Sequence, residues 1–388
     1  MGKLRRDEEA VGGRRRLPVT FRLLHLTTGL VILLGLAGCA SISPEEQARR
    51  NRILTQYESG LTALRAGNYE LARNDLDAAL LQLGSNTAGD ASARESRGYF
   101  NAESVKSFRG EPYERVMAYY YRGILYWMDG EPDNARAAFK SAAVQDADPE
   151  NGKYQCDWVL VDYLDGLATT KLGGDGNDLW RRAETNARLN RPSPYDPQAN
   201  VLFFLEMGQG PVKYAAGEYG EQLKFRPGSA PDPVAVIKVA DQTVKIGPFD
   251  DLTYQATTRG GRVMDHILQG KAVFKGTTAT LGTAAIIAGS SVAIAGNSNT
   301  SRNVGMGIAL AGLVSTVVSA ATTPEADTRQ WKNLPNLLAF ASLRLAPGDY
   351  SATIEFQSPS GKVLVTREAR FQVVTGRDTV LFLSDRNT

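Results

Sequence analysis

The chain has 388 residues, with 44 lysines and arginines against 42 aspartates and glutamates, so its formal net charge is only +2. This balance argues against nucleic acid as a partner, because nucleic-acid-binding proteins usually carry a concentrated positive charge. With two cysteines and two histidines in the whole chain, a disulfide-rich fold and a histidine-rich metal site are excluded.

Residues 1–38 have the layout of an export signal. Basic residues are frequent between Lys3 and Arg22, an apolar stretch follows from 23 to 36, and small residues come next. The apolar stretch is shorter than the roughly 20 residues that a membrane-spanning helix needs. A signal-anchor helix and a twin-arginine export signal are the alternatives. Removal of residues 1–38 would take away seven basic and three acidic residues and leave a net charge of −2.

The run Leu36, Ala37, Gly38 and Cys39 resembles the lipobox of bacterial lipoprotein precursors. This resemblance implies cleavage before Cys39 and a diacylglycerol on its thiol. Each buried methylene of an acyl chain is worth about 0.8 kcal/mol, so two or three chains anchor a protein to membrane lipid. Position 40 is alanine and not the aspartate associated with inner-membrane retention. For a host with two membranes we therefore expect the outer membrane, with the protein facing the periplasm.

Residues 51–192 are predicted to form paired amphipathic helices. Gly60 precedes Leu76 by the same offset as Gly123 precedes Phe139, and alanines occupy matching positions in both segments. This spacing resembles the tetratricopeptide repeat, in which small residues let two antiparallel helices approach closely. A generic helical bundle with the same packing is the alternative.

An aromatic cluster in the second of these segments exceeds what one core stripe needs. It comprises Tyr113, Tyr119, Tyr120, Tyr121, Tyr126 and Trp127. The cluster is consistent either with core or with the lining of a groove for a partner's peptide, as in repeat arrays. All of these except Tyr121 are our partner-groove candidates, with another envelope protein as the expected partner.

The middle of the chain, residues 193–275, mixes strands and helix. A buried strand is predicted at 201–205, and further strands at 235–239 and 243–246. Gly208 and Gly210 followed by a lysine could in principle cradle a phosphate, but Pro211 removes a backbone donor where such a site needs one. A turn between strands is the preferred interpretation.

Residues 276–324 contain two uncharged stretches, 276–301 and 303–324, that predict a helical hairpin. Small residues would form its contact seam. The packing candidates are Gly282, Gly289, Gly296, Gly305 and Gly312. Three placements stay open: insertion in a bilayer, packing on the protein's own body or on a copy of itself as a homo-oligomer, and a disordered or signal-like segment.

Alternating apolar and polar residues dominate the rest of the chain and predict a small antiparallel β-sandwich. The expected fold class is α+β. The expected divisions are a signal peptide (1–38), a tether (39–50), tetratricopeptide-like helical repeats (51–192), a mixed connecting region (193–275), a Gly/Ala-rich hydrophobic hairpin (276–324) and a β-rich C-terminal domain (325–388).

Taken whole, the chain resembles an uncharacterised group of bacterial repeat-containing lipoproteins, notably in the stretches 110–115 and 203–211. No activity comes with this resemblance. We expect a protein-binding scaffold in cell-envelope assembly or maintenance, with no enzyme activity, cofactor or metal. The alternative is a bilayer-inserting or oligomeric pore- or complex-forming component that uses the hairpin. A glycan-directed enzyme using Asp162 and Asp165 is a weaker hypothesis.

Overall fold

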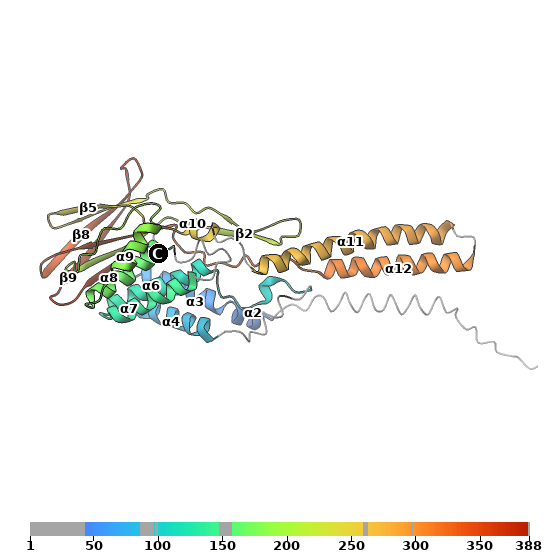
Figure 1. The fold of residues 1–388 in the computed structure, drawn as a ribbon, viewed down its shortest axis with the longest axis horizontal. Helices are drawn as coiled ribbons and strands as arrows, with labels where there is room; N and C mark the ends of the chain where they lie inside the picture. The colour runs from blue at the N-terminus through green and yellow to red at the C-terminus, as the bar shows by residue number, and fades with distance from the viewer. Residues whose placement is uncertain are drawn as a thin grey trace, which may run out of the picture. The chain divides into compact units, whose positions relative to one another are not determined.

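The computed structural model describes residues 43–85, 97, 100–146, 157–258, 263–295 and 298–386. Its contacts divide the chain into two compact units. One contains Phe274–Ala321, which we call the hairpin unit. The other, Pro44–Val273 with Thr322–Thr388, we call the body. The protein contains both helices and mainly antiparallel sheets, which confirms the α+β class (Figure 1).

Most helices of the body come from the first half of the chain, as the apolar periodicity predicts. Those from the first half are α2 (Pro44–Arg50), α3 (Arg52–Arg65), α4 (Tyr69–Ser85), the 3₁₀ turn η1 (Glu103–Val105), α6 (Pro112–Met128), α7 (Pro132–Asp146), α8 (Val159–Lys171) and α9 (Asn177–Asn186). The short α10 (Leu252–Thr257) comes later in the chain. In chain order, α3 packs on α4, α6 on α7, α7 on α8 and α8 on α9.

The equal offsets seen in the sequence have a common packing cause. A Cβ atom added to Gly123 on α6 would lie 2.6 Å from Cε1 of Phe139 on α7, so only glycine fits there. Gly60 on α3 faces Leu76 on α4 in the same way, and a Cβ added to it would lie 3.1 Å from Cγ of that leucine. In both pairs a large side chain of the second helix sits directly on the backbone of the first, which brings the two helices close together.

Within the described ranges, the strands form two four-stranded sheets and one separate hairpin. In chain order they are β1 (Val201–Met207), β2 (Val212–Ala216), β3 (Gln222–Arg226), β4 (Val234–Val239), β5 (Gln242–Ile246), β6 (Asp250–Asp251), β7 (Leu337–Leu343), β8 (Gly348–Gln357), β9 (Val363–Val373) and β10 (Thr379–Ser384). One sheet has the order β10-β1-β7-β6, the other β5-β4-β8-β9, and β2 pairs with β3.

The prediction of a self-contained C-terminal β domain is wrong. Strand β1 from the middle of the chain lies between two C-terminal strands, parallel to β10 and antiparallel to β7. Strand β8 likewise pairs with β4 of the middle region, antiparallel. Residues 325–388 therefore complete sheets begun by residues 201–251. The alternation of apolar residues predicts the strands correctly, but it contains no information about which strand is the neighbour.

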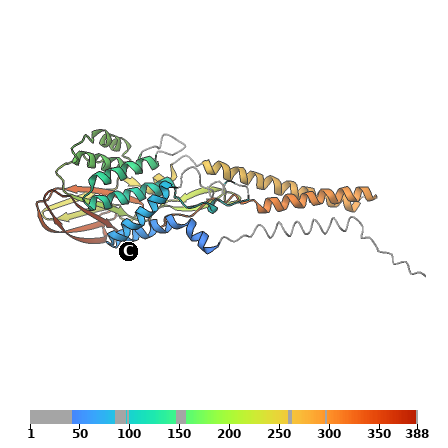
Figure 2. The same cartoon turned by 90° about the horizontal axis from the view of Figure 1, so that it is seen from below.

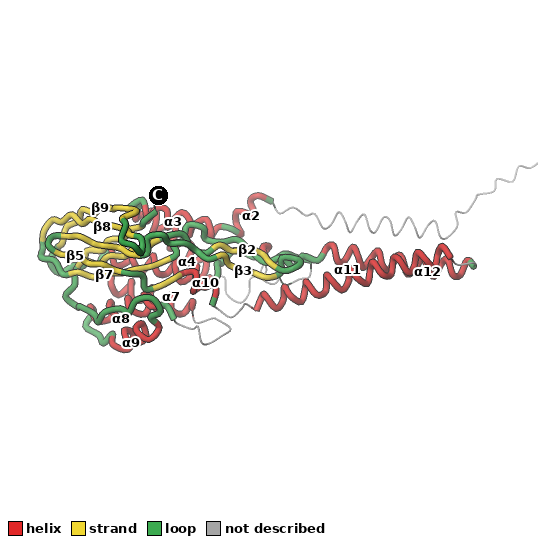
Figure 3. The backbone as a smooth tube through the Cα atoms, turned by 90° about the horizontal axis from the view of Figure 1, so that it is seen from above, coloured by secondary structure: helices red, strands yellow, loops and turns green. Residues whose placement is uncertain are grey.

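Strand β1 occupies the centre of the body. All seven of its residues are buried, because both faces of its sheet are covered. Alternate residues, including Phe203 and Leu205, meet the second sheet, while Leu202 and Phe204 meet the helices. The body thus has helices, a first sheet and a second sheet in succession (Figures 2 and 3).

Candidate functional site

The hairpin unit consists of most of α11 (Val263–Ala295) and of α12 (Asn299–Ala321), which lie side by side (Figures 1 and 3). A Cβ on Gly282 would lie 2.7 Å from the carbonyl oxygen of Gly312, and one on Gly312 would lie 2.6 Å from the oxygen of Gly282. These two predicted packing glycines therefore bring the two backbones into contact. Gly289 and Gly305 lie in the same helices, and Gly296 lies outside the described residues.

Two hydroxyl groups join the helices across this seam. Ser315 Oγ donates to the carbonyl of Thr278, and Ser319 Oγ donates to that of Lys275, both at 2.8 Å. Other hydroxyls of the unit donate to carbonyls of their own helix: Thr278, Thr280, Thr283, Ser291 and Thr316. These side chains are therefore satisfied by the hairpin's own backbone and need no outside partner.

Large apolar side chains remain exposed on the hairpin unit. On α11, Leu281 is 60% and Ile287 is 63% exposed. On α12 the exposed ones are Val304, Met306, Ile308, Leu313 and Val314. No charged residue lies between 276 and 301 or between 303 and 324, and α12 carries a single charge, Arg302. The two helices of the unit therefore lack the charged face of an ordinary surface helix. Among the helices that the structure describes, none combines the length and the apolar character that a bilayer crossing requires.

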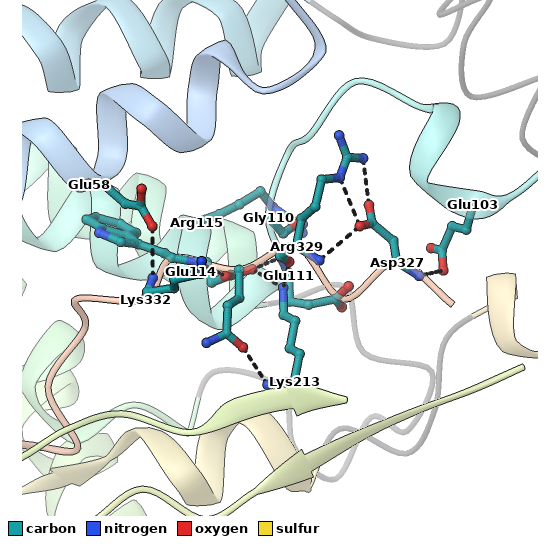
Figure 4. A network of polar contacts seen from close by, with 12 residues as sticks. Glu58, Glu103, Gly110, Glu111, Glu114, Arg115, Lys213, Asp327, Arg329 and Lys332 are labelled. Carbon is teal, nitrogen blue, oxygen red and sulfur yellow. Dashed lines mark hydrogen bonds and ion pairs between the residues drawn. The ribbon is translucent and has the colours of Figure 1, made fainter. Parts of the chain in front are cut away.

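One segment of the body, residues 101–106, holds both chain segments that flank the hairpin unit. Before the unit, Lys271 Nζ donates to the carbonyl of Asn101 at 2.8 Å. After it, the backbone N–H of Asp327 donates to Glu103 at 2.8 Å (Figure 4). Lys106 Nζ binds the same carboxylate at 2.5 Å. Burial lowers the pKa of Lys271. This segment carries no sequence pattern that would have revealed its role.

Arg329 extends this network. Its guanidinium donates to Asp327 at 2.7 and 2.9 Å, to Asn51 Oδ1 at 2.8 Å and to the carbonyl of Lys106 at 2.8 Å. Burial alone would raise the pKa of Asp327, but the hydrogen bonds and charge of Arg329 hold it below its usual value. The segment after α12 is thereby fixed to Asn51, the N-cap residue of α3, and to residues 103–106.

The stretch 110–115 that carries the family resemblance forms a second buried network. Glu114 caps α6 by accepting from the backbone N–H of Glu111 at 2.6 Å. Its carboxylate also accepts from Lys213 Nζ at 2.5 Å and from the N–H of Trp331 at 2.7 Å (Figure 4). Both side chains of the ion pair are almost fully buried. The stretch therefore has a structural role, joining α6 to β2 and to the segment before β7.

The predicted partner groove is filled by the protein itself. Tyr113, Tyr120 and Trp127 are only 1–2% exposed, and the rings of Tyr120 and Trp127 contact the phenyl ring at position 204 of β1. Tyr119 and Tyr126 are partly buried against the same core. The aromatic excess serves to cover a sheet, so the groove prediction is corrected for the three buried residues.

The stretch 203–211 is equally structural. Glu206 forms an ion pair with Arg65 and accepts from Tyr121 Oη at 2.8 Å. The backbone N–H groups of Gly208 and Gly210 donate to Asp385 and to the carbonyl of residue 334, respectively. These donors are therefore engaged within the chain and do not cradle a phosphate.

The carboxylate pair considered for glycan chemistry lies in the interior. Asp162 is bound by the guanidinium of Arg182, and burial raises its pKa to about 6. Asp165 is also buried, and its pKa is likewise raised by burial. Within the described ranges, no group of three or more histidine, cysteine, aspartate or glutamate side chains could hold a metal ion.

A cavity of about 230 Å³ lies beside the start of α8. Among its lining residues, Arg188 donates to Tyr254 Oη at 2.7 Å, and its guanidinium stacks over that ring. Asp250 accepts from the backbone N–H groups of residues 159 and 160 at 2.9 and 2.8 Å, and burial raises its pKa to about 7. Asp250 therefore caps α8, which gives this part of the lining a structural role.

The predicted lipobox, Leu36 to Cys39, lies outside the described residues, as does Cys156. Comparisons of the chain with protein-family models, with curated proteins and with solved structures find no match.

Proposed function

We propose that this protein is a membrane-tethered component of the bacterial cell envelope that works by assembling with other protein chains and not by catalysis. The lipobox at Cys39 supports a lipid anchor, most simply in the outer membrane facing the periplasm. The observation that carries the assembly function is the exposed apolar surface of the hairpin unit, whose bonded hydroxyls are satisfied by its own backbone.

The energetic argument concerns the exposed side chains. Burying a leucine or isoleucine contributes about 1.5–3 kcal/mol relative to leaving it in water. Leu281 and Ile287 are both more than half exposed on one helix, and α12 adds five further exposed apolar side chains. A contact surface over this unit would thus gain several kcal/mol. A contact along 276–301 and 303–321, on either side of Arg302, would desolvate no charged side chain.

The same reasoning disfavours the repeat groove as the binding surface. The matched contacts of Gly60 with Leu76 and of Gly123 with Phe139 support a tetratricopeptide-like relationship of the helix pairs. Their aromatic face, however, covers the sheet of the same chain. The two facing sheets support a sandwich-like scaffold, completed by strands from both halves of the chain. We therefore assign the body a supporting role and the hairpin unit the assembling role.

The experiment compares substitutions on the two units in cells. Mild solubilisation and native gel electrophoresis should place the wild type in a high-mass species, and Leu281→Glu with Ile287→Glu should remove it. Leu81→Glu is the matched control, because Leu81 is 76% exposed on α4 of the body. Cys39→Ala should shift the protein out of the membrane fraction. An unchanged high-mass species in the double variant contradicts the proposal.

A further inference from the structure

Exposed apolar side chains lie on both sides of the hairpin unit, and their positions indicate how many partners would be needed to bury them. The seam direction on α11 is fixed by Lys275, Thr278 and Gly282, which contact α12. At about 100° per residue, Leu281 lies roughly 100° to one side of Gly282 and Ile287 roughly 140° to the other. Both are exposed, so neither side of α11 is covered.

Helix α12 has the same arrangement about its own seam. Measured from Gly312 at about 100° per residue, Leu313 lies roughly 100° to one side and Val304 roughly 80° to the other. Both are exposed apolar side chains. The hairpin unit therefore presents two apolar flanks, one on each side of the plane that contains its helices.

Building on the proposed function, we infer that the hairpin unit is covered by hairpin units of further copies of this chain, with three or more copies in the assembly. A dimer would cover one flank of each copy and leave the other in water. In a closed ring each copy contacts two neighbours through different surfaces, so both flanks are buried.

The dimensions of the unit agree with this number of copies. About 22 helical residues span roughly 33 Å, and two helices side by side are roughly 20 Å wide, so one flank measures roughly 660 Å². A standard interface takes about 600–1,000 Å² from each partner. One flank alone reaches the lower end of this range, so each flank is large enough for one neighbouring copy. Two such flanks give each copy room for two neighbours, as a closed ring requires.

The composition of the flanks suits contact with an identical unit. Ala284, Ala288 and Ala311 are exposed beside the larger apolar residues, and small residues let neighbouring helices approach closely. No charged residue lies between 276 and 301 or between 303 and 324. The charged residues of the unit are Lys275 and Arg302, the latter in the first turn of α12. Copies can therefore pack along the stretches between these two residues and after them without burying a charge.

The test uses the full mature chain carrying Cys39→Ala, purified in mild detergent and measured by light scattering and native mass spectrometry. A particle of three or more copies is expected. Leu281→Glu and Leu313→Glu should each block a flank and reduce the particle to small species, whereas the control Leu81→Glu should leave it intact.

A particle of one or two copies, for the chain with Cys39→Ala as its sole substitution, overturns the inference. If the in-cell complex still depends on Leu281 and Ile287 in that case, the proposed function survives with a different protein as the partner. The same chain is also mixed with vesicles of phosphatidylethanolamine and phosphatidylglycerol. Capture by these vesicles as single copies would overturn the inference in favour of a lipid surface.

Discussion

Substitution of Gly282 by alanine tests whether backbone contact sets the packing of the hairpin unit. The added Cβ would lie 2.7 Å from the oxygen of Gly312 and 2.8 Å from the backbone nitrogen of Thr316. Neither atom belongs to a flexible side chain, so the two helices must move apart. We expect the seam hydrogen bond from Ser315 to Thr278 to lengthen as a result.

The magnitude follows from two opposing effects. Alanine is favoured over glycine inside a helix by about 1 kcal/mol. Overpacking of a close contact costs about 1–3 kcal/mol, and this contact is at the severe end because both sides are backbone. The net expectation for Gly282→Ala is a loss of about 1–2 kcal/mol. Gly270 is the control on the same helix: nothing lies within 4 Å of its Cβ position, so Gly270→Ala should gain about 1 kcal/mol.

Amide hydrogen exchange measured by mass spectrometry reports this local stability. A loss of 1.4 kcal/mol corresponds to a tenfold change in the opening equilibrium. Peptides from 276–295 and 303–321 should therefore exchange about ten times faster in Gly282→Ala than in the wild type, and Gly270→Ala should show no acceleration. Equal exchange in the two variants would refute the reasoning that the seam depends on the missing side chain.

Three further predictions concern the body. Gly123→Ala should destabilise the body by about 1–3 kcal/mol in urea unfolding, because the new Cβ would lie 2.6 Å from the Phe139 ring. Adding Phe139→Leu should relieve part of this loss. Additive effects of the two substitutions on the free energy of unfolding would contradict this account. Lys213→Met should lower the free energy of unfolding by about 3–5 kcal/mol, because it leaves the buried Glu114 carboxylate without its cation. Adding Glu114→Gln should restore part of this stability. A double variant no more stable than Lys213→Met would contradict a stabilising role of the ion pair. Burial raises the pKa of Asp250 to about 7, so the folded protein holds a proton that the unfolded chain releases near pH 4. The stability from this group should be complete below about pH 4 and lost as the pH rises through about 7, and Asp250→Asn should flatten the stability profile in that window; an unchanged slope would show that the Asp250 carboxyl is not its source.

The local periodicity of apolar and small residues was sufficient to predict several helices and strands. The buried strand, the paired helices and the two halves of the hairpin unit each show a repeat of apolar or small residues along a short stretch of chain. The offsets of Gly60 to Leu76 and of Gly123 to Phe139 are visible in the sequence because each pair belongs to neighbouring helices. In such cases the contact is close in sequence as well as in space.

The aromatic cluster shows what periodicity does not predict, namely which surface covers an apolar face. Tyr113, Tyr120 and Trp127 lie on an apolar face of α6. The same face would suit a partner's peptide or a sheet of the same chain. The rings of Tyr120 and Trp127 lie in the interior because they contact β1, and the ring of Tyr113 because it contacts β3. Both strands come far later in the chain. The energetic gain from burial is similar in both cases, so the sequence pattern does not distinguish them.

The sequence by itself determined the α+β class, the helix pairs, the hairpin and its glycine seam, and it carries the lipobox prediction at Cys39. The tertiary structure decided which strands are neighbours, which aromatic face is covered and how distant charges combine. Glu114 and Lys213, for example, are 99 residues apart and carry no shared spacing pattern. The physical reason is that local contacts impose a repeat on the residues that make them, whereas contacts between distant segments depend on how the whole chain buries its apolar surface.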